Sequence, residues 1–246
     1  MTILRLERRE GMKNVKLALI SSSLILASTS VGAAEVSGNV TLATDYIYRG
    51  ISQTEEEATI QGGFDVEGES GLYAGVWASN IAFDGHIEID IYAGYAGEIN
   101  EDLGFDIGLL HYDYPNNTGP NDSSFDEIYG SISYRDLTIG LAYSNDFFFE
   151  TGNATYVYID YSLPLPNSFG LDFHYANQSV DKGATFGIET TEKSADYAEY
   201  SISINRTVAD IDLSLTWHDT DLSTIDCFSG TDYCKSRVVF GLSKSL

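Results

Sequence analysis

The chain of 246 residues contains 13 Lys and Arg against 37 Asp and Glu, which gives a formal net charge of −24. An acidic surplus of this size argues against a nucleic-acid partner, because few cationic side chains remain to neutralise phosphates. Hydrophobic residues make up 43% of the chain and aromatic residues 13%, so the composition also argues against a disordered protein.

The N-terminus has the pattern of an export signal. Lys13 and Lys16 form a basic region, the stretch 17–31 is apolar, and residues 32–34 are small, as at a cleavage site. We therefore assign residues 1–34 to an upstream extension and a cleaved signal peptide. Residues 35–246 then form one domain.

From residue 36 onward, apolar and polar side chains alternate with the two-residue period of a β-strand. In the opening segment, 36–49, Tyr46 and Tyr48 fall on the apolar face, while Asp45 and Arg49 fall on the polar face. We expect the two tyrosines to meet lipid near a membrane interface, and Asp45 and Arg49 to face a wet interior. In all, twelve such segments are expected, beginning near residues 36, 58, 72, 86, 103, 127, 137, 154, 169, 197, 209 and 236.

The connections between these segments alternate in length. Short turns are expected at 68–71, 98–102, 135–136, 164–168 and 206–207, and the other connections, several of them longer, at 50–57, 81–85, 115–126, 145–153, 179–196 and 219–235. Short turns on one side and longer loops on the other, around an even number of antiparallel strands, are typical of bacterial outer-membrane barrels. Both ends of the mature chain would then lie in the periplasm.

A soluble β-sandwich also shows this alternation, so the membrane assignment depends on further features. Charged residues recur on the polar faces, and the C-terminal RVVFGLSKSL ends inside a strand, as in barrels that present their last strand to the assembly machinery. The sequence thus predicts an all-β fold: a transmembrane antiparallel up-and-down β-barrel of about 12 strands. Aromatic residues also recur near the ends of the apolar faces, as in interfacial girdles: Tyr46, Tyr48, Tyr95, Tyr134, Tyr143, Tyr161, Tyr175 and Trp217. A periplasmic β protein is the alternative.

The polar faces supply the candidate functional residues. Carboxylates outnumber the basic residues expected inside, Arg49, Arg206 and Arg237, so the lumen is expected to favour cations, and twelve strands predict a narrow lumen. The alternative is that acids and arginines pair across the lumen and only stabilise it. The residues expected to line the lumen and set its selectivity are Asp45, Arg49, Asp65, Glu88, Asp90, Asp106, Glu127, Asp160, Asp172 and Glu199.

Two cysteines, Cys227 and Cys234, lie seven residues apart in CFSGTDYC. In an exported protein such a pair predicts a local disulfide. A zinc site would need more ligands than this stretch offers, since His218 is the only nearby histidine. We therefore expect no metal site and no cofactor.

With the segments laid out, the chain resembles the TorF family of porins, a proteobacterial family formerly catalogued as Gcw_chp. The resemblance implies an exported outer-membrane β-barrel in a Gram-negative bacterium, and it brings no catalytic residues. The matching stretches, which with the intervening pattern cover essentially the whole mature chain, are VSGNVTLATDYIYRGISQTEEEATIQGGFDV, ESGLYAGVWASNI, IEIDIYAGYAGEI and RVVFGLSKSL.

These observations predict a porin, not an enzyme, that lies among outer-membrane lipid and lipopolysaccharide and passes small polar solutes by diffusion. One alternative is a barrel hydrolase that uses His218 with Asp219, although neighbouring residues on a strand face opposite sides and no histidine has an obvious serine partner. Another is a structural or adhesive barrel whose acidic loops, such as 219–235, hold divalent cations. No calcium-loop pattern supports such a cation site.

Overall fold

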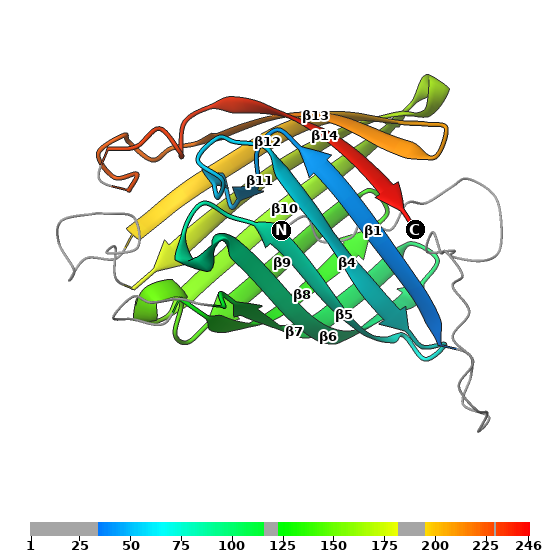
Figure 1. Ribbon diagram of the computed structural model, residues 1–246. Coiled ribbons are helices and arrows are strands. Elements are labelled where there is room, and N and C mark those ends of the chain that lie inside the picture. Colours follow the sequence, from blue (N-terminus) through cyan, green and yellow to red (C-terminus); the bar gives the residue numbers. More distant parts are fainter. Residues whose placement is uncertain (1–33, 116–122, 182–194, 229) are drawn as a thin grey trace.

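The computed structural model describes residues 34–115, 123–181, 195–228 and 230–246, so the predicted signal peptide lies outside it up to residue 33. In this part of the chain, twelve antiparallel strands close into one barrel, as predicted, with β1 paired to both β4 and β14 (Figure 1). No described helix is long and apolar enough to cross a membrane. The barrel strands are β1 (Glu35–Ala43), β4 (Thr59–Glu67), β5 (Leu72–Asn80), β6 (Ile87–Asn100), β7 (Leu103–Asp113), β8 (Phe125–Tyr134), β9 (Leu137–Ser144), β10 (Ala154–Leu165), β11 (Phe169–Val180), β12 (Ala195–Val208), β13 (Ile211–Thr220) and β14 (Arg237–Ser245).

All twelve strands begin within two residues of their predicted starts. Three predicted boundaries are wrong by three residues or more, and one of them is the turn expected at 98–102, which covers only 101–102 because β6 runs on to Asn100. The first strand ends at Ala43, so residues 44–49 do not continue it, and the turn expected at 206–207 lies at 209–210 because β12 runs on to Val208. Parts of the predicted loops 115–126 and 179–196 lie outside the described residues.

Turns and loops separate to opposite ends of the barrel. The turns at 68–71, 101–102, 135–136, 166–168 and 209–210 lie at one end, called here the short-turn end, together with the start of β1 and the end of β14 (Figure 1). The opposite end, called the long-loop end, carries the loops 145–153 and 221–236. A disulfide joins Cys227 to Cys234 in the second of these loops, as predicted.

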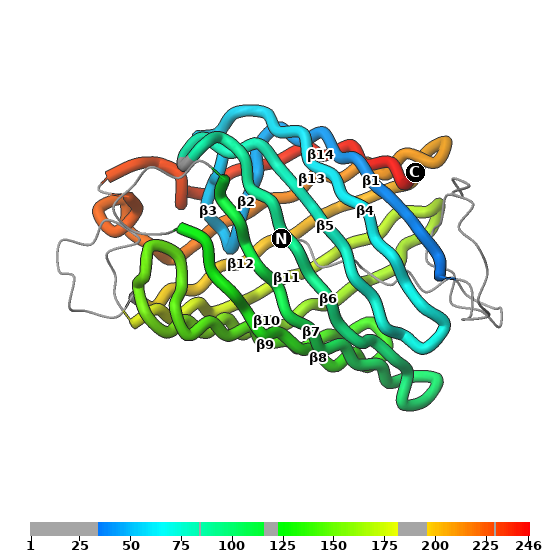
Figure 2. Tube along the Cα trace, turned by 60° about the horizontal axis from the view of Figure 1, so that its bottom comes forward, coloured from blue at the N-terminus to red at the C-terminus, as the bar shows by residue number. Residues whose placement is uncertain are grey.

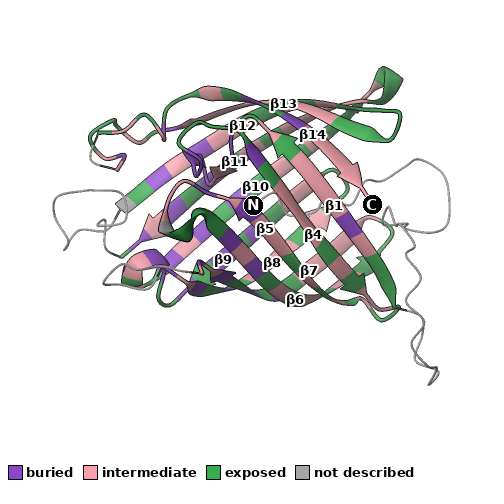
Figure 3. Cartoon of the chain, viewed as in Figure 1, coloured by how far each residue is buried: buried purple, intermediate pink, exposed green. Residues whose placement is uncertain are grey.

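The two faces of each strand differ in exposure, as the alternation predicts (Figure 3). On β6, Ile87 and Ile91 point outward and are exposed, while Glu88 and Asp90 point inward and are buried. Of the predicted girdle residues, those that are exposed on the outer face are Tyr95, Tyr134, Tyr143, Tyr161 and Tyr175. The outer face is therefore apolar and aromatic and the inner face polar.

On the inner face, tyrosines lie opposite glycines of neighbouring strands. Tyr92 of β6 pairs with Gly75 of β5, and Tyr129 of β8 pairs with Gly108 of β7. A Cβ added at either glycine would overlap the tyrosine ring. The absence of a side chain at these glycines therefore leaves room for the tyrosine rings of the neighbouring strands.

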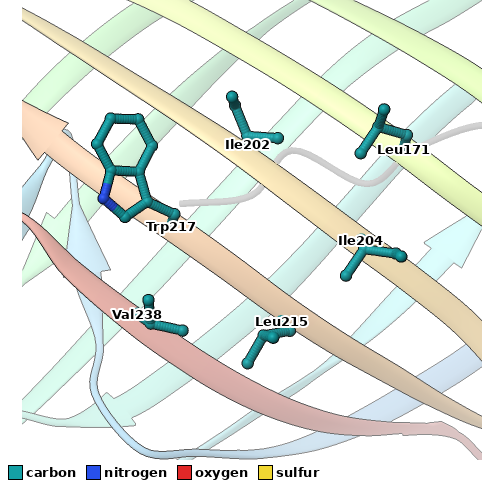
Figure 4. A pocket seen from close by; sticks show the side chains of 6 residues that line it. All are labelled: Leu171, Ile202, Ile204, Leu215, Trp217 and Val238. Atoms are coloured by element: carbon teal, nitrogen blue, oxygen red, sulfur yellow. The ribbon is translucent and has the colours of Figure 1, made fainter.

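A shallow hollow of about 410 Å³ lies on the outer face over β11 to β14 (Figure 4). Only apolar and aromatic side chains line it: Leu171, Ile202, Ile204, Leu215, Trp217 and Val238. It belongs to the same outer band as the exposed residues above.

The outer band generates a stability prediction. Leu109 is 64% exposed on β7 and pairs with Ala93 at the middle of β6, so it lies near the mid-height of the band. Leu109→Arg should lower the free energy of unfolding in lipid vesicles by about 2–4 kcal/mol, because a guanidinium at this height loses its hydration. Urea titration of the vesicle-folded protein measures this. Ile225→Arg, in the exposed 221–236 loop, is the control and should change little; equal effects would contradict a lipid-covered band.

Candidate functional site

The segment between β1 and β4, residues 44–58, folds into the barrel at the long-loop end, and we call it the inner loop (Figure 2). Its two short strands, β2 (Ile47–Tyr48) and β3 (Ile51–Ser52), pair with each other. Between them Arg49 has φ 47° and Gly50 φ 80°. A side chain at position 50 would collide with Thr220 and Glu199, so glycine is needed at the point where the loop meets the far wall.

Arg49 holds the tip of the inner loop against the opposite strands. Its guanidinium donates to both carboxylate oxygens of Glu127 at 2.8 Å and to Gln178 Oε1 at 2.7 Å, and lies over the Tyr156 ring at 4.2 Å. The Tyr197 hydroxyl donates to the Arg49 carbonyl at 2.9 Å. Burial is the largest single effect and lowers the pKa of Arg49, but the Glu127 carboxylate and the neighbouring tyrosines together outweigh it, so the pKa is raised well above its usual value. The guanidinium therefore stays charged inside the barrel.

The prediction that Tyr46 and Tyr48 face lipid is wrong. The Tyr46 hydroxyl donates to Glu88 at 2.6 Å, and its ring packs edge-on against Trp77 at 5.4 Å. Burial and then the Glu88 charge raise the pKa of Tyr46 well above its usual value, so it remains a donor. The Tyr48 ring packs against Tyr112 at 5.8 Å. Alternation stops at Ala43, and the one sequence signal was Ile47, which falls on the polar face of the extended pattern.

Asp45 lies inside the barrel, as predicted, but it does not pair with Arg49. It accepts hydrogen bonds from Ser52 Oγ at 2.7 Å and from Thr54 Oγ1 at 2.8 Å, both within the inner loop. Arg237 of β14 donates to its second oxygen at 2.9 Å and also pairs with Glu56 at 3.1 Å. Arg237 therefore joins the inner loop to the strand that closes the barrel.

The other predicted lumen residues lie at two levels. Glu88, Asp90, Glu127 and Glu199 are buried near the long-loop end, whereas Asp65, Asp106, Asp160 and Asp172 are partly exposed and lie nearer the middle and the short-turn end. At the second level, Tyr92 donates to Asp65, Tyr73 to Asp106 at 2.6 Å and Asn205 to Asp172 at 2.6 Å. Asp65 and Asp106 thus each accept from a tyrosine hydroxyl and have no Arg or Lys partner among the described residues, whereas Asp160 pairs with His174.

Positive charge on the inner face is scarce. Arg206 points outward and covers the Phe169 ring at 4.8 Å, so its expected inward position is wrong. His174 adds a positive charge that the sequence did not predict: Nδ1 bonds Asp160 at 2.7 Å, and Nε2 bonds the Tyr156 oxygen at 3.0 Å, whose own proton goes to Glu199. Both ring nitrogens are then donors, which makes the ring an imidazolium.

The residue types that a serine hydrolase would need also lie near His174 on the inner face. Asp160, His174, Ser201 and His218 occupy directly paired positions on four neighbouring strands. A nucleophilic serine needs a neutral base in hydrogen-bond reach, but His174 donates from both nitrogens to Asp160 and Tyr156. His218 and Asp219 lie on opposite faces because β13 continues to Thr220. The absence of enzyme activity stays a prediction.

Acidic side chains of the 221–236 loop have local partners. In the 221–236 loop, Asp226 accepts a hydrogen bond from Ser223 and Asp232 pairs with Lys235 at 2.5 Å. Within the described ranges, no group of three or more His, Cys, Asp or Glu could hold a metal ion. The divalent-cation alternative therefore gains no support from these residues.

The model of a family described as a bacterial protein of unknown function (Gcw_chp) matches residues 27–246. The chain belongs to this family. No curated protein sequence matches the Gcw_chp protein significantly. The narrower TorF name stays a prediction.

Solved porins resemble the Gcw_chp protein in fold. The NanC porin has 12% sequence identity, a TM-score of 0.54, and a match that covers 84% of this chain and 97% of that one. The KdgM porin, in a structure described as a complex with disordered oligogalacturonate, has 9% identity and a TM-score of 0.51, with 86% and 99% covered. At such identities the likeness shows the barrel fold alone.

The buried ion pair of the inner loop generates a second stability prediction. Arg49→Met should lower the free energy of unfolding by about 3–5 kcal/mol, because it leaves the buried Glu127 carboxylate without its cation. Adding Glu127→Leu should recover much of this loss. Urea titration of the two single variants and the double variant measures the coupling. Additive losses would show that Arg49 and Glu127 do not act as a pair.

Proposed function

We propose that this protein is an outer-membrane channel of a Gram-negative bacterium for passive diffusion of small polar solutes, narrow and cation-favouring. One observation carries the proposal: a closed barrel whose outer face is apolar and whose inner face is acidic. The barrel would lie among outer-membrane lipid and lipopolysaccharide, with the short-turn end in the periplasm. The assembly machinery would recognise β14.

The outer face supports the membrane location. Large apolar side chains stand exposed all round the barrel, with Phe64 63%, Leu109 64% and Ile132 58% exposed. A water-soluble monomer rarely exposes a continuous apolar surface, whereas hydrocarbon requires one. The closed ladder also leaves no strand edge unpaired, which is the condition for β-structure in a bilayer.

The inner face supports cation preference. The nine carboxylates that were predicted to line the lumen all lie on the inner loop or on the inner faces of strands. Among the described residues, the cations found on the same side are Arg49, Arg237 and His174. Each of these three is already bonded to a carboxylate. A solute in the lumen would therefore meet a net negative field, which lowers the energy of a cation and raises that of an anion.

The inner loop supports narrowness. Its residues contact the inner faces of β6, β8, β10, β11 and β12 at the long-loop end. Solutes would have to pass beside this loop. The same network favours a second function, a structural surface barrel whose lumen stays occupied and does not conduct.

Ion selectivity tests the channel directly. In planar bilayers with a KCl gradient, the reversal potential should show cation preference, and Asp65→Asn with Asp106→Asn should reduce the permeability ratio by roughly two-fold per charge, as expected for a charge about 8 Å away in water. Glu69→Gln, in an exposed turn, is the control and should leave the ratio nearly unchanged. A barrel without discrete channels would support the structural function instead, and anion preference would contradict the proposed lumen.

The role of the inner loop can be tested through its anchor. Arg49→Met should raise the single-channel conductance, because the loop loses its bonds to Glu127 and Gln178 and leaves more of the lumen open. Arg135→Met removes the exposed Arg135–Asp102 pair at the short-turn end and is the matched control. Equal conductance of the wild type and both variants would show that the inner loop does not limit flow.

A further inference from the structure

Asp90 is the inward carboxylate that the described chain leaves unpartnered. It is 0% exposed, and neither Oδ1 nor Oδ2 has a hydrogen-bond partner among the described residues. A carboxylate that is buried without donors or a cation is destabilising, so such a group needs an explanation. Every other buried acid on the inner face has a donor: Tyr46 for Glu88, Arg49 for Glu127 and Tyr156 for Glu199.

Aromatic rings lie on both sides of Asp90. In the barrel ladder, Asp90 pairs directly with Trp77 of β5 and with Tyr112 of β7. Side chains at directly paired positions share a face, with Cβ atoms about 5 Å apart. The Asp90 carboxylate therefore lies between the side chains of Trp77 and Tyr112.

The inner loop adds a second ring on each side. Tyr46 packs edge-on against Trp77 at 5.4 Å between centroids, and Tyr48 packs edge-on against Tyr112 at 5.8 Å. After burial and the Glu88 charge, the charge of Asp90 also raises the pKa of the Tyr46 phenol. We call these four residues, Tyr46, Tyr48, Trp77 and Tyr112, the aromatic box.

No described cation of the chain serves this carboxylate. Arg49 is committed to Glu127 and Gln178, and Arg237 to Asp45 and Glu56. Glu88 lies two residues along β6 on the same face, about 6.6 Å away along the strand, and adds a second negative charge. The Arg49 guanidinium already covers one face of the Tyr48 ring, 4.8 Å from its centroid, so the site combines the free acceptor oxygens of Asp90, negative charge and the remaining ring surfaces.

We propose that Asp90 and the aromatic box form a binding site for a primary alkylammonium ion. The ammonium N–H groups donate to Oδ1 and Oδ2 of Asp90, and the rest of the cation lies against the ring faces, where cation–π attraction adds to the ion pair. The inference rests on the proposed channel and names a class of solute for it. Because Tyr46 and Tyr48 belong to the inner loop, movement of that loop would open or close the box.

Hydrogen bonding decides between ammonium classes. Asp90 lacks donors on both oxygens, which a primary ammonium supplies with three N–H groups. Tetramethylammonium carries the same charge without a donor, and K⁺ carries it without a donor or an apolar surface. Methylammonium should therefore bind more tightly than either.

The binding experiment uses a reporter already in the site. The chain has two tryptophans, so Trp217→Phe leaves Trp77 of the aromatic box as the only source of indole fluorescence. This protein, folded in detergent micelles, is titrated with methylammonium chloride at constant ionic strength set with NaCl. We expect a saturable change in Trp77 emission. Asp90→Asn should weaken the apparent affinity at least ten-fold, and Asp65→Asn, a tyrosine-bonded inward carboxylate, should not.

A second variant keeps the test decisive if Asp90→Asn does not fold. Tyr48→Leu leaves every carboxylate in place and should weaken methylammonium binding several-fold, because the box loses one ring. Circular dichroism and urea titration confirm folding of each variant.

Four results would overturn the proposal: no saturable change, which leaves Asp90 as a neutral protonated group; an unchanged affinity in Asp90→Asn; an equal response to tetramethylammonium; or an equal response to K⁺. The measurement needs no conduction. Conduction without methylammonium binding would contradict only the binding site proposed here. Methylammonium binding without conduction would contradict only the proposed channel function.

Discussion

Pairing of β1 with β14 is the contact on which the rest of the structure depends. It joins residues 39–43 to 241–245 and removes both free edges of a twelve-stranded sheet. Closure also turns two equivalent faces into an outside and an inside, so apolar residues such as Leu109 share one continuous surface and acids such as Asp106 share another. An open sheet of the same strands would expose backbone groups and polar faces to hydrocarbon, where neither finds a partner.

The enclosed acids then need partners, and for all the predicted lumen acids except Asp90 the barrel supplies them in two ways. Towards the short-turn end, tyrosine and asparagine side chains donate to carboxylates that remain in contact with solvent. At the long-loop end the acids are buried, and the inner loop brings Arg49 and Tyr46 to Glu127 and Glu88. The contacts that fix the inner loop in the lumen are therefore the same contacts that neutralise the buried charge.

The strand pattern was predictable because successive side chains of a strand point to opposite faces, so a strand with one apolar face shows an apolar residue at every second position whatever its neighbours are. Glu88 and Asp90 could be assigned to the inner face from local sequence, and so could the exposed face with Ile87 and Ile91. The candidate site was only partly predictable. Asp45 and Arg49 were placed inside, but their partners Arg237, Glu127 and Gln178 lie more than 75 residues away, and no local spacing encodes such contacts.

The sequence by itself determined the number of strands, their starts, the face on which most strand side chains lie and the disulfide between Cys227 and Cys234, because each of these depends on residues within one or two neighbouring segments. Only the tertiary structure decided that residues 44–58 turn inward, that Tyr46 and Tyr48 meet carboxylates and rings instead of lipid, and that Arg206 faces out while His174 faces in. The inner loop is held in the lumen by its bonds to the buried carboxylates of Glu88 and Glu127, and these carboxylates become buried together only once the barrel has closed.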